Sequence, residues 1–490
     1  MSVISSSYNI LKYWRLIYVS LAVILAGLFE IFVWDRQPGL GFLFYIILAL
    51  AGFISITVIN KQFRQPKALF LLIPILVLCL DIFVYNNLII TVFARPLVLV
   101  FMILFAILST YDNTQKHQFS LLKIPFFGNA FLMFSKIGHV FQDLFVWRES
   151  KTKLYRKIAL GILIALPLLY FFTVLFLSAD KVFAESLSNF FKFSLDEDLV
   201  ARIIRTLFLS VFLACLFYVT CGKEHVLGEK VVSVKKLDSV VAGVVLFLIN
   251  TLFALFVFFQ IKYLFGNAEF VLKSGKTFAE YARSGFFELV WVLVLASLVV
   301  FVVYRSLVYH RQHWIIKLLL FLLAAQVFVV AMSALKRMNL YQSEYGFTIE
   351  RLCAEWFIYF VCFLLATTVV GLALRLQFRN LFYTFLIIGI IAITVVCSLN
   401  VDLLIANKNI SLAIAQNKEL DIDYLSGLSV DVAPAMTKLS SMAGNIKLKS
   451  KKPISVTELI THKKETVKNI DSFLEFNWGR FQAREIMKSL

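Results

Sequence analysis

Long apolar stretches recur along this chain as far as residue 399. Each is about 18–25 residues long, the length with which an α-helix crosses roughly 30 Å of hydrocarbon. We expect transmembrane helices near residues 14–34, 40–59, 69–86, 88–110, 158–178, 203–221, 239–264, 286–309, 315–335, 355–375 and 381–399. The pattern predicts an all-α fold, a polytopic membrane protein with about 11 transmembrane helices.

Composition excludes a water-soluble fold. Of the 490 residues, 60% are hydrophobic and only 16% are charged, with 51 Phe among them. Soluble domains average about 25% charged and 45–50% apolar residues. The expected partner of so much apolar surface is the lipid bilayer.

The net charge of +18 follows from loops that carry many lysines and arginines. These loops alternate with more acidic ones, which is the pattern of cytoplasmic and non-cytoplasmic connections. It predicts a multi-pass protein of the inner membrane with a cytoplasmic N-terminus. After an odd number of spans the C-terminal tail is extracytoplasmic. No nucleic acid is expected, because the basic runs lack a recognition module.

The sequence divides into two parts. Residues 1–399 form the transmembrane domain, alternatively as two bundles, 1–110 and 150–399, joined by an amphipathic cytoplasmic segment at Phe126–Trp147. Residues 400–490 are polar and rich in lysine, and they are predicted to form a small helical tail.

Signals for chemistry are sparse. The six cysteines contain no CxxC pair, and the chain has no HExxH, P-loop or GxSxG motif. We therefore expect no catalytic residue, no metal and no cofactor.

One polar motif, Thr277–Glu288, precedes the predicted span at 286–309. Glu280 and Arg283 are three residues apart on one helical face and are expected to pair. Glu288 follows just inside the membrane boundary, and Tyr281 lies between the two charges.

The second polar motif, Arg337–Arg351, connects two apolar runs. Gly346 is expected to adopt the left-handed conformation of a turn, and Thr348 to cap the next helix. Arg351 falls in the first helical turn, where the helix dipole disfavours a cation. It is therefore expected to pair with Glu344, with Glu355 or with a ligand.

The two motifs are predicted on the same side of the membrane and share tyrosine, arginine and carboxylate side chains. Such side chains bind anionic or hydroxylated groups. The candidate pocket consists of Glu280, Tyr281, Arg283, Glu288, Arg337, Tyr341, Glu344, Tyr345 and Arg351. The alternative is a purely structural clamp between two spans.

Charges also occur inside predicted spans. Asp81 and Arg95 flank the turn at Asn86-Asn87 at similar depth, so an intramembrane pair is expected. Further polar residues are expected to form hydrogen bonds between helices or to lie at the membrane boundary. These are Glu30, Asn250, Gln260, Lys262 and Gln326.

The segments FAEYARSGFFEL, RMNLYQSEYGFTIER, NVDLLIANKNI and LDIDYLSGLSVDVAPAM resemble a bacterial family of polytopic membrane proteins known as a domain of unknown function. The resemblance covers roughly residues 150–490. It implies a many-helix inner-membrane protein with a polar tail and no established activity.

The leading hypothesis is a non-enzymatic protein with a transport-like or envelope-sensing role. An outward-facing polar pocket would bind an anionic lipid or a small molecule, and the tail would act as its lid or bind an envelope protein. The alternative is a membrane-embedded transferase that acts on lipid or cell-wall precursors, with Glu280, Glu288 and Glu344 as acid/base candidates.

Overall fold

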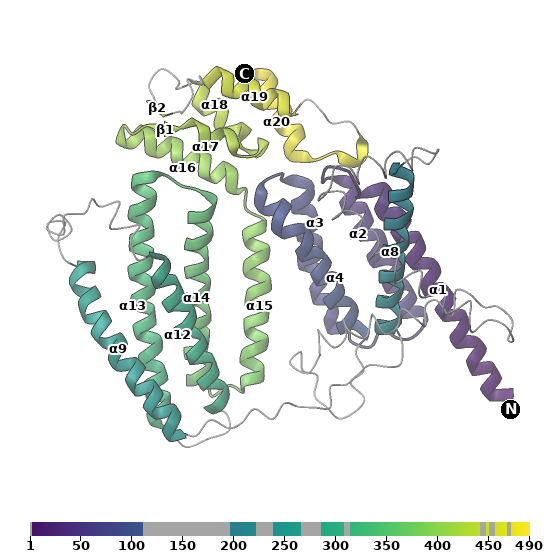
Figure 1. The fold of residues 1–490 in the computed structure, drawn as a ribbon, viewed down its shortest axis with the longest axis horizontal. Helices are drawn as coiled ribbons and strands as arrows, with labels where there is room; N and C mark the ends of the chain where they lie inside the picture. The colour runs from purple at the N-terminus through teal and green to yellow at the C-terminus, as the bar shows by residue number, and fades with distance from the viewer. Residues whose placement is uncertain are drawn as a thin grey trace, which may run out of the picture. The chain divides into compact units, whose positions relative to one another are not determined.

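The structure, a computed structural model, describes residues 2–110, 197–221, 239–265, 286–307, 314–441, 447–449, 456–467 and 472–490. Nearly all of these residues are helical (Figure 1). The chain forms two compact units. Unit 1 contains Met1–Val84, Arg95–Val231 and Ile470–Asn477, and unit 2 contains Tyr85–Ala94, Val232–Asn469 and Trp478–Leu490.

Unit 1 is held together by aromatic rings. Its described elements are α1 (Ser2–Phe32), α2 (Leu40–Ile59), η1 (Pro66–Leu71), α3 (Leu72–Val84), α4 (Arg95–Thr110), α8 (Glu197–Cys221) and η6 (Phe473–Glu475). Phe217 of α8 stacks with Tyr18 of α1 at 6.3 Å and with Phe53 of α2 at 6.1 Å between ring centroids. Phe53 in turn meets Phe105 of α4 edge-on at 5.9 Å. The rings join four helices, and such pairs add stability beyond their buried area.

A charge pair joins α1 to α8 in unit 1. Arg205 lies 2.5 Å from the Glu30 carboxylate, and its guanidinium lies 4.1 Å from the centroid of the Trp34 ring. The prediction that Glu30 forms a contact between helices is confirmed. Each charge satisfies the other in an apolar setting, where an unpaired charge is costly.

The third and fourth predicted spans begin irregularly. A 3₁₀ turn, η1, leads into α3, and a π-helical turn, η2 (Ile90–Ala94), leads into α4. Pro96 is the second residue of α4. Proline has no N–H and its ring clashes with the carbonyl of the preceding turn, so a regular α-helix cannot run through it. A π turn is a known way to absorb such a break.

In unit 2 the central membrane helix is α13 (Trp314–Tyr345). It packs against α9 (Ser239–Phe265), α12 (Phe286–Leu307) and α14 (Ile349–Ala373). The core between these helices is made of fully buried aliphatic side chains, among them Leu246, Leu293, Leu323 and Ile358. A further helix, α15 (Phe378–Cys397), packs on α14.

Two polar side chains form hydrogen bonds between helices α9 and α13 in the core of unit 2. The Asn250 amide of α9 donates to the Leu319 carbonyl of α13 at 3.1 Å, and the Gln326 amide of α13 donates to the Asn250 carbonyl at 3.3 Å. The predicted hydrogen bonds between helices are confirmed for both residues. The side chains of Gln260 and Lys262 lie outside the described residues.

The C-terminal segment folds as short helices. In unit 2 it comprises α16 (Val401–Gln416), β1 (Leu420–Asp421), α17 (Ile422–Gly427), η4 (Val430–Val432), α18 (Ala433–Ser441), β2 (Leu448–Lys449), α19 (Val456–Val467) and α20 (Trp478–Ser489). The two strands form a parallel pair of two residues each. The chain leaves helix α17 at Leu428 and restarts with Ser429 as the cap of η4.

The helices of residues 1–399 suit a membrane. Among the described residues, seven helices are long and apolar enough to cross one, and shorter apolar stretches lie at Leu16–Phe32, Ala242–Phe258 and Leu289–Arg305. Large apolar side chains on their outer faces are well exposed, for example Trp291 at 65% and Phe363 at 60%. An exterior of this kind requires a lipid environment. The all-α, multi-pass membrane class is confirmed.

Some predictions lie outside the described residues. These are the span at 158–178 and the amphipathic segment Phe126–Trp147. The total of 11 spans and the proposed domain boundaries therefore stay predictions.

The start of α2 makes a close backbone contact that generates a first prediction. A Cβ at Gly41 would collide with the Phe32 carbonyl oxygen and come within 3.1 Å of the Leu474 carbonyl oxygen. We expect Gly41→Ala to lower the free energy of unfolding by about 1–3 kcal/mol, because backbone cannot move aside cheaply. A thermal-stability assay in detergent, read by size-exclusion chromatography, measures the change.

Gly27→Ala is the matched control, because a Cβ at Gly27 has nothing within 4 Å. This control is expected to keep or raise the melting temperature, since alanine favours a helix interior over glycine. Equal melting temperatures for the two variants would show that the contact at Gly41 does not constrain unit 1.

Candidate functional site

Only a short part of the motif Arg337–Arg351 forms the connection between the two helices, whereas we expected a longer one. Helix α13 continues through Tyr345, and only Gly346, Phe347 and Thr348 separate it from α14. The residues before Gly346 include neither glycine nor proline, so nothing in them ends a helix. The polar motif is therefore mostly the last turns of α13, extended past its apolar part.

The local predictions for this turn are confirmed. Gly346 has a φ of +80°, a conformation that side chains with a Cβ rarely adopt. Thr348 is the N-cap of α14, and its hydroxyl accepts a hydrogen bond from the Arg351 N–H at 3.4 Å. Glu350 lies in the first turn of α14, where the helix dipole favours an acid.

Arg351 has other partners than the predicted carboxylates. Its guanidinium donates to the carbonyl oxygens of Tyr345 at 3.0 Å and Gly346 at 2.5 Å, and it lies 4.1 Å from the centroid of the Tyr341 ring. The last carbonyls of a helix lack partners within the helix and carry its negative dipole end. The arginine that opens α14 thus stabilises the end of α13. The prediction of Glu344 or Glu355 as its partner is wrong.

Helix α16 binds the backbone of the turn directly. The Asn409 side chain accepts from the Phe347 N–H at 2.6 Å and donates to the Phe347 carbonyl at 2.9 Å. One amide thus satisfies both backbone groups of one residue. A Cβ on Gly346 would lie 2.9 Å from the Asn409 Oδ1, so a larger residue would strain the backbone and displace the Asn409 amide from its contact.

Two more residues of the tail reach the same turn. The Tyr424 hydroxyl accepts from the Ile349 N–H at 2.9 Å, one of the orphan amides at the start of α14. The Lys408 ammonium lies 4.5 Å from the centroid of the Phe347 ring. Burial raises the pKa of Tyr424 to about 12, so its hydroxyl stays protonated at neutral pH.

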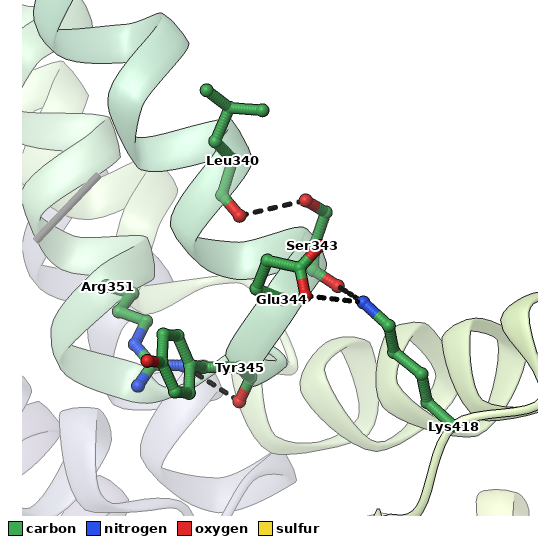
Figure 2. Close-up of polar contacts among 6 residues, drawn as sticks. All are labelled: Leu340, Ser343, Glu344, Tyr345, Arg351 and Lys418. Carbon is green, nitrogen blue, oxygen red and sulfur yellow. Dashed lines mark hydrogen bonds and ion pairs between the residues drawn. The ribbon is translucent and has the colours of Figure 1, made fainter. Parts of the chain in front are cut away.

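An ion pair lies at the edge of this contact (Figure 2). The Lys418 ammonium donates to the Ser343 carbonyl at 2.9 Å and lies 3.0 Å from the Glu344 carboxylate. The Glu344 side chain is 45% exposed, so solvent screens the charge pair. The bond to the carbonyl is therefore the more specific part of the contact.

A second contact joins the tail to the turn before η2. The Asp431 carboxylate accepts from the Asn86 N–H at 2.7 Å, and the Asp402 carboxylate accepts from the Ser429 N–H at 2.8 Å. Both carboxylates are almost fully buried, with 4% and 1% exposure. In each, Oδ1 has no hydrogen-bond partner among the described residues. An ionised carboxylate in this state is costly.

Lys463 of α19 brings a positive charge into the same region. Its ammonium donates to the carbonyl oxygens of Ser426 and Leu428 and is 4% exposed. Burial lowers the pKa of Lys463 to about 8, and Asp402 opposes that shift. Burial, aided by the negative charge of Asp402, raises the pKa of Asp431 to about 6, while the Asn86 N–H opposes the rise.

The structure brings together part of the predicted pocket. Tyr341, Glu344 and Tyr345 lie in the last turns of α13, Arg351 of α14 contacts both tyrosines, and Lys418 of the tail binds Glu344. Arg337 lies further back in α13. Glu280, Tyr281 and Arg283, and the side chain of Glu288, lie outside the described residues.

The predicted intramembrane pair also stays a prediction. Asp81 is buried in α3, and Arg95 is the first residue of α4. The buried Nε of Arg95 has no hydrogen-bond partner in the described part of the chain.

The residues of the tail that bind the end of α13 and the two turns were not predicted. They are Asn409, Lys418, Tyr424 and Asp431. Three of them lie in the segments NVDLLIANKNI and LDIDYLSGLSVDVAPAM, which the resemblance singled out. The resemblance therefore marked these segments, but the hydrogen-bond partners of Asn409, Tyr424 and Asp431 lie 62 or more residues away in sequence. One sequence does not specify such pairings.

The chemistry of the site is that of a docking surface. In the described ranges no group of three or more His, Cys, Asp or Glu side chains is placed to hold a metal ion. The polar groups of the tail point at backbone amides and carbonyls of the turns. Such contacts hold the tail against the turns, and they form only when the backbone of the turn has the right conformation.

Taken together, fold and site define a polytopic helical membrane protein whose C-terminal segment is docked on turns between its helices. The chain belongs to the family DUF4153, described as a domain of unknown function, which matches residues 72–439. The predicted family membership is confirmed. The match begins earlier than the resemblance indicated and ends before residue 490. Neither curated proteins nor solved structures give a match.

Loss of the Asn409 amide provides the second prediction. We expect Asn409→Leu to lower the free energy of unfolding by about 1–3 kcal/mol, the net value of two hydrogen bonds. Amide hydrogen exchange of Phe347 should rise at the same time, since its N–H loses its acceptor. Exchange mass spectrometry of the purified protein measures this amide.

Asn407→Leu on the same helix is the control, because Asn407 is exposed. It is expected to leave exchange at Phe347 unchanged. Unchanged exchange in Asn409→Leu would contradict the two-bond contact.

The buried Asp431 carboxyl predicts a pH dependence. A pKa raised from 3.8 to about 6 means that the folded state binds this proton more tightly than the unfolded state. The stabilisation from proton binding is therefore full below pH 3.8 and is lost as pH rises through 6. Asp431→Asn keeps an acceptor for the Asn86 N–H and removes the titration.

The measurement is the melting temperature of Asp431→Asn minus that of the wild type, from pH 4 to 7. We expect this difference to grow in favour of the variant as pH rises. The exposed Glu419, as Glu419→Gln, is the control, and the difference for this variant should change less with pH. A flat difference for Asp431→Asn would show that Asp431 ionises without cost.

Proposed function

We propose that this protein is a non-enzymatic envelope sensor whose C-terminal segment, residues 401–490, controls the membrane helices. The observation that supports this most is the contact of Asn409 with Phe347. A tail that merely covered a surface would not need hydrogen bonds to both backbone groups of a turn between two spans.

The route of control consists of three attachments within unit 2. Asn409 and Tyr424 bind the start of α14, and Asp431 binds the turn before η2. Helix α15 continues into α16 after only three residues, Ser398 to Asn400. A change in the tail therefore moves the ends of several membrane helices at once. The attachments thus give a signal at the tail a physical path to the membrane helices.

We place the tail on the extracytoplasmic side of an inner membrane. Within unit 2 the tail lies at the C-terminal ends of α13 and α15 (Figure 1). Basic residues at the opposite helix ends include Arg305, Lys317, Arg375 and Arg379. Basic residues collect at cytoplasmic ends, which supports this orientation.

The partner of the tail is proposed to be an envelope protein. On α20 the rings of Trp478 and Phe481 lie 5.6 Å apart and are 47% and 37% exposed. Exposed aromatic side chains are enriched at protein interfaces. A transport-like role would use the same tail as a lid over Arg351 and Glu344. The transferase alternative gains no support here, because Glu344 pairs with Lys418.

The test is complementation of a strain that lacks the gene. The measurement is survival under envelope stress, with the amount of each variant in the membrane as a control. Deletion of 401–490 and Asn409→Leu are both expected to abolish complementation, and Asn407→Leu is expected to retain it. Full complementation by the truncated protein, present at the wild-type level, would rule out the sensor.

Orientation has its own measurement. Fusions of alkaline phosphatase and of green fluorescent protein after Leu490 report the two sides of the membrane. Phosphatase activity without fluorescence is expected. The reverse result would place the tail in the cytoplasm.

A further inference from the structure

An apolar groove runs between α14 and α15 and is separate from the docking surface of the tail. Its volume is about 340 Å³. Side chains that line it come from three elements: Phe93 of η2, Trp356 and Phe360 of α14, and Ile393 and Val396 of α15. All of these elements belong to unit 2. The volume is within the range of small-molecule sites, about 300–1,000 Å³.

Two features keep the groove open. At Gly389 of α15 a Cβ would have nothing within 4 Å, so the missing side chain leaves free space beside α14. On the third side η2 is π-helical, a geometry that often marks functional sites. Phe93 in this turn lines the groove.

The depth of the groove follows from helix geometry. On α14 it extends from Cys353 to Phe360, and on α15 from Gly389 to Val396. At 1.5 Å per residue each range covers about 10 Å. Cys353 lies four residues after the start of α14, and Val396 is next to the end of α15. The groove therefore starts about one turn inside the membrane helices. It extends toward the middle of the bilayer, which lies about 15 Å below the edge of the hydrocarbon core.

We propose that this groove binds one acyl chain of a phospholipid from the leaflet nearest the tail. Both walls are helices apolar enough to span a membrane, so the groove opens into hydrocarbon. Among the described residues, its lining side chains are apolar apart from the Cys353 thiol and the Trp356 indole N–H, which favours an apolar ligand. The length of about 10 Å is under two helical turns, which offers a partner helix little contact and suits a segment of one acyl chain.

This inference is independent of the sensor role, because neither Asn409 nor Asp431 lines the groove. It adds a lipid as a ligand of the membrane helices. The head group of the bound lipid would lie near the start of α14. That is the same helix end that Asn409 and Tyr424 hold.

The test is photolabelling of the full-length protein in vesicles. The probe is a phosphatidylcholine with a diazirine in one acyl chain, and peptide mass spectrometry locates the label. Peptides with residues 353–360 and 389–396 are expected to carry more label than the outer face of α9, where Phe247 and Leu252 are 60% and 65% exposed. Equal labelling of these surfaces would overturn the proposal.

A second experiment fills the groove with a larger side chain. Gly389→Leu is expected to reduce label in the groove peptides at least threefold. Gly243→Leu on α9, where a Cβ also has nothing within 4 Å, is the matched control and should leave it unchanged. Ala392→Leu on the same wall repeats the effect if Gly389→Leu fails to fold. Undiminished labelling in either folded variant would overturn the site.

The lipid class is tested by competition. Excess unlabelled phosphatidylcholine is expected to reduce labelling of the groove peptides. Competition by oleate alone, without competition by the phospholipid, would identify a free fatty acid and refute the proposed occupant.

Discussion

The structure depends on satisfying backbone groups where one membrane helix ends and the next begins. At Gly346–Thr348 only three residues separate α13 from α14, so two sets of orphan amides and carbonyls meet. Arg351 supplies donors for the carbonyls at the end of α13. Asn409 and Tyr424 of the tail supply partners for the amides that follow. A turn this short is stabilised because distant parts of the chain complete its hydrogen bonds.

The membrane part follows from the same rule applied to side chains. Polar residues within the helical core bond to a neighbouring helix, as Asn250 does to Leu319 and Glu30 does to Arg205. The remaining core is aliphatic in unit 2 and aromatic in unit 1. The outer faces carry large apolar side chains because lipid is their solvent. The groove at Gly389 is a place where this outer face is hollow.

The tail differs from the spans in its use of charge. Asp402, Asp431 and Lys463 are nearly fully buried, yet each bonds to backbone groups. Buried charges are weak evidence for stability, because the cost of removing them from water offsets their attraction. Burial raises the pKa of Asp431 to about 6, so protonation of this carboxyl is coupled to the docked arrangement.

The sequence by itself determined the membrane class, most helix positions and the geometry of the turn at Gly346 and Thr348. These features depend on local composition, on helix length and on one residue's backbone freedom. It also showed that Arg351 needs a partner, because a cation opposes the helix dipole there. Only the tertiary structure decided that this partner is a pair of carbonyls, and that Asn409 and Asp431 hold the turns. Those contacts join residues far apart in the chain, and a single sequence carries no physical signal of which distant groups meet.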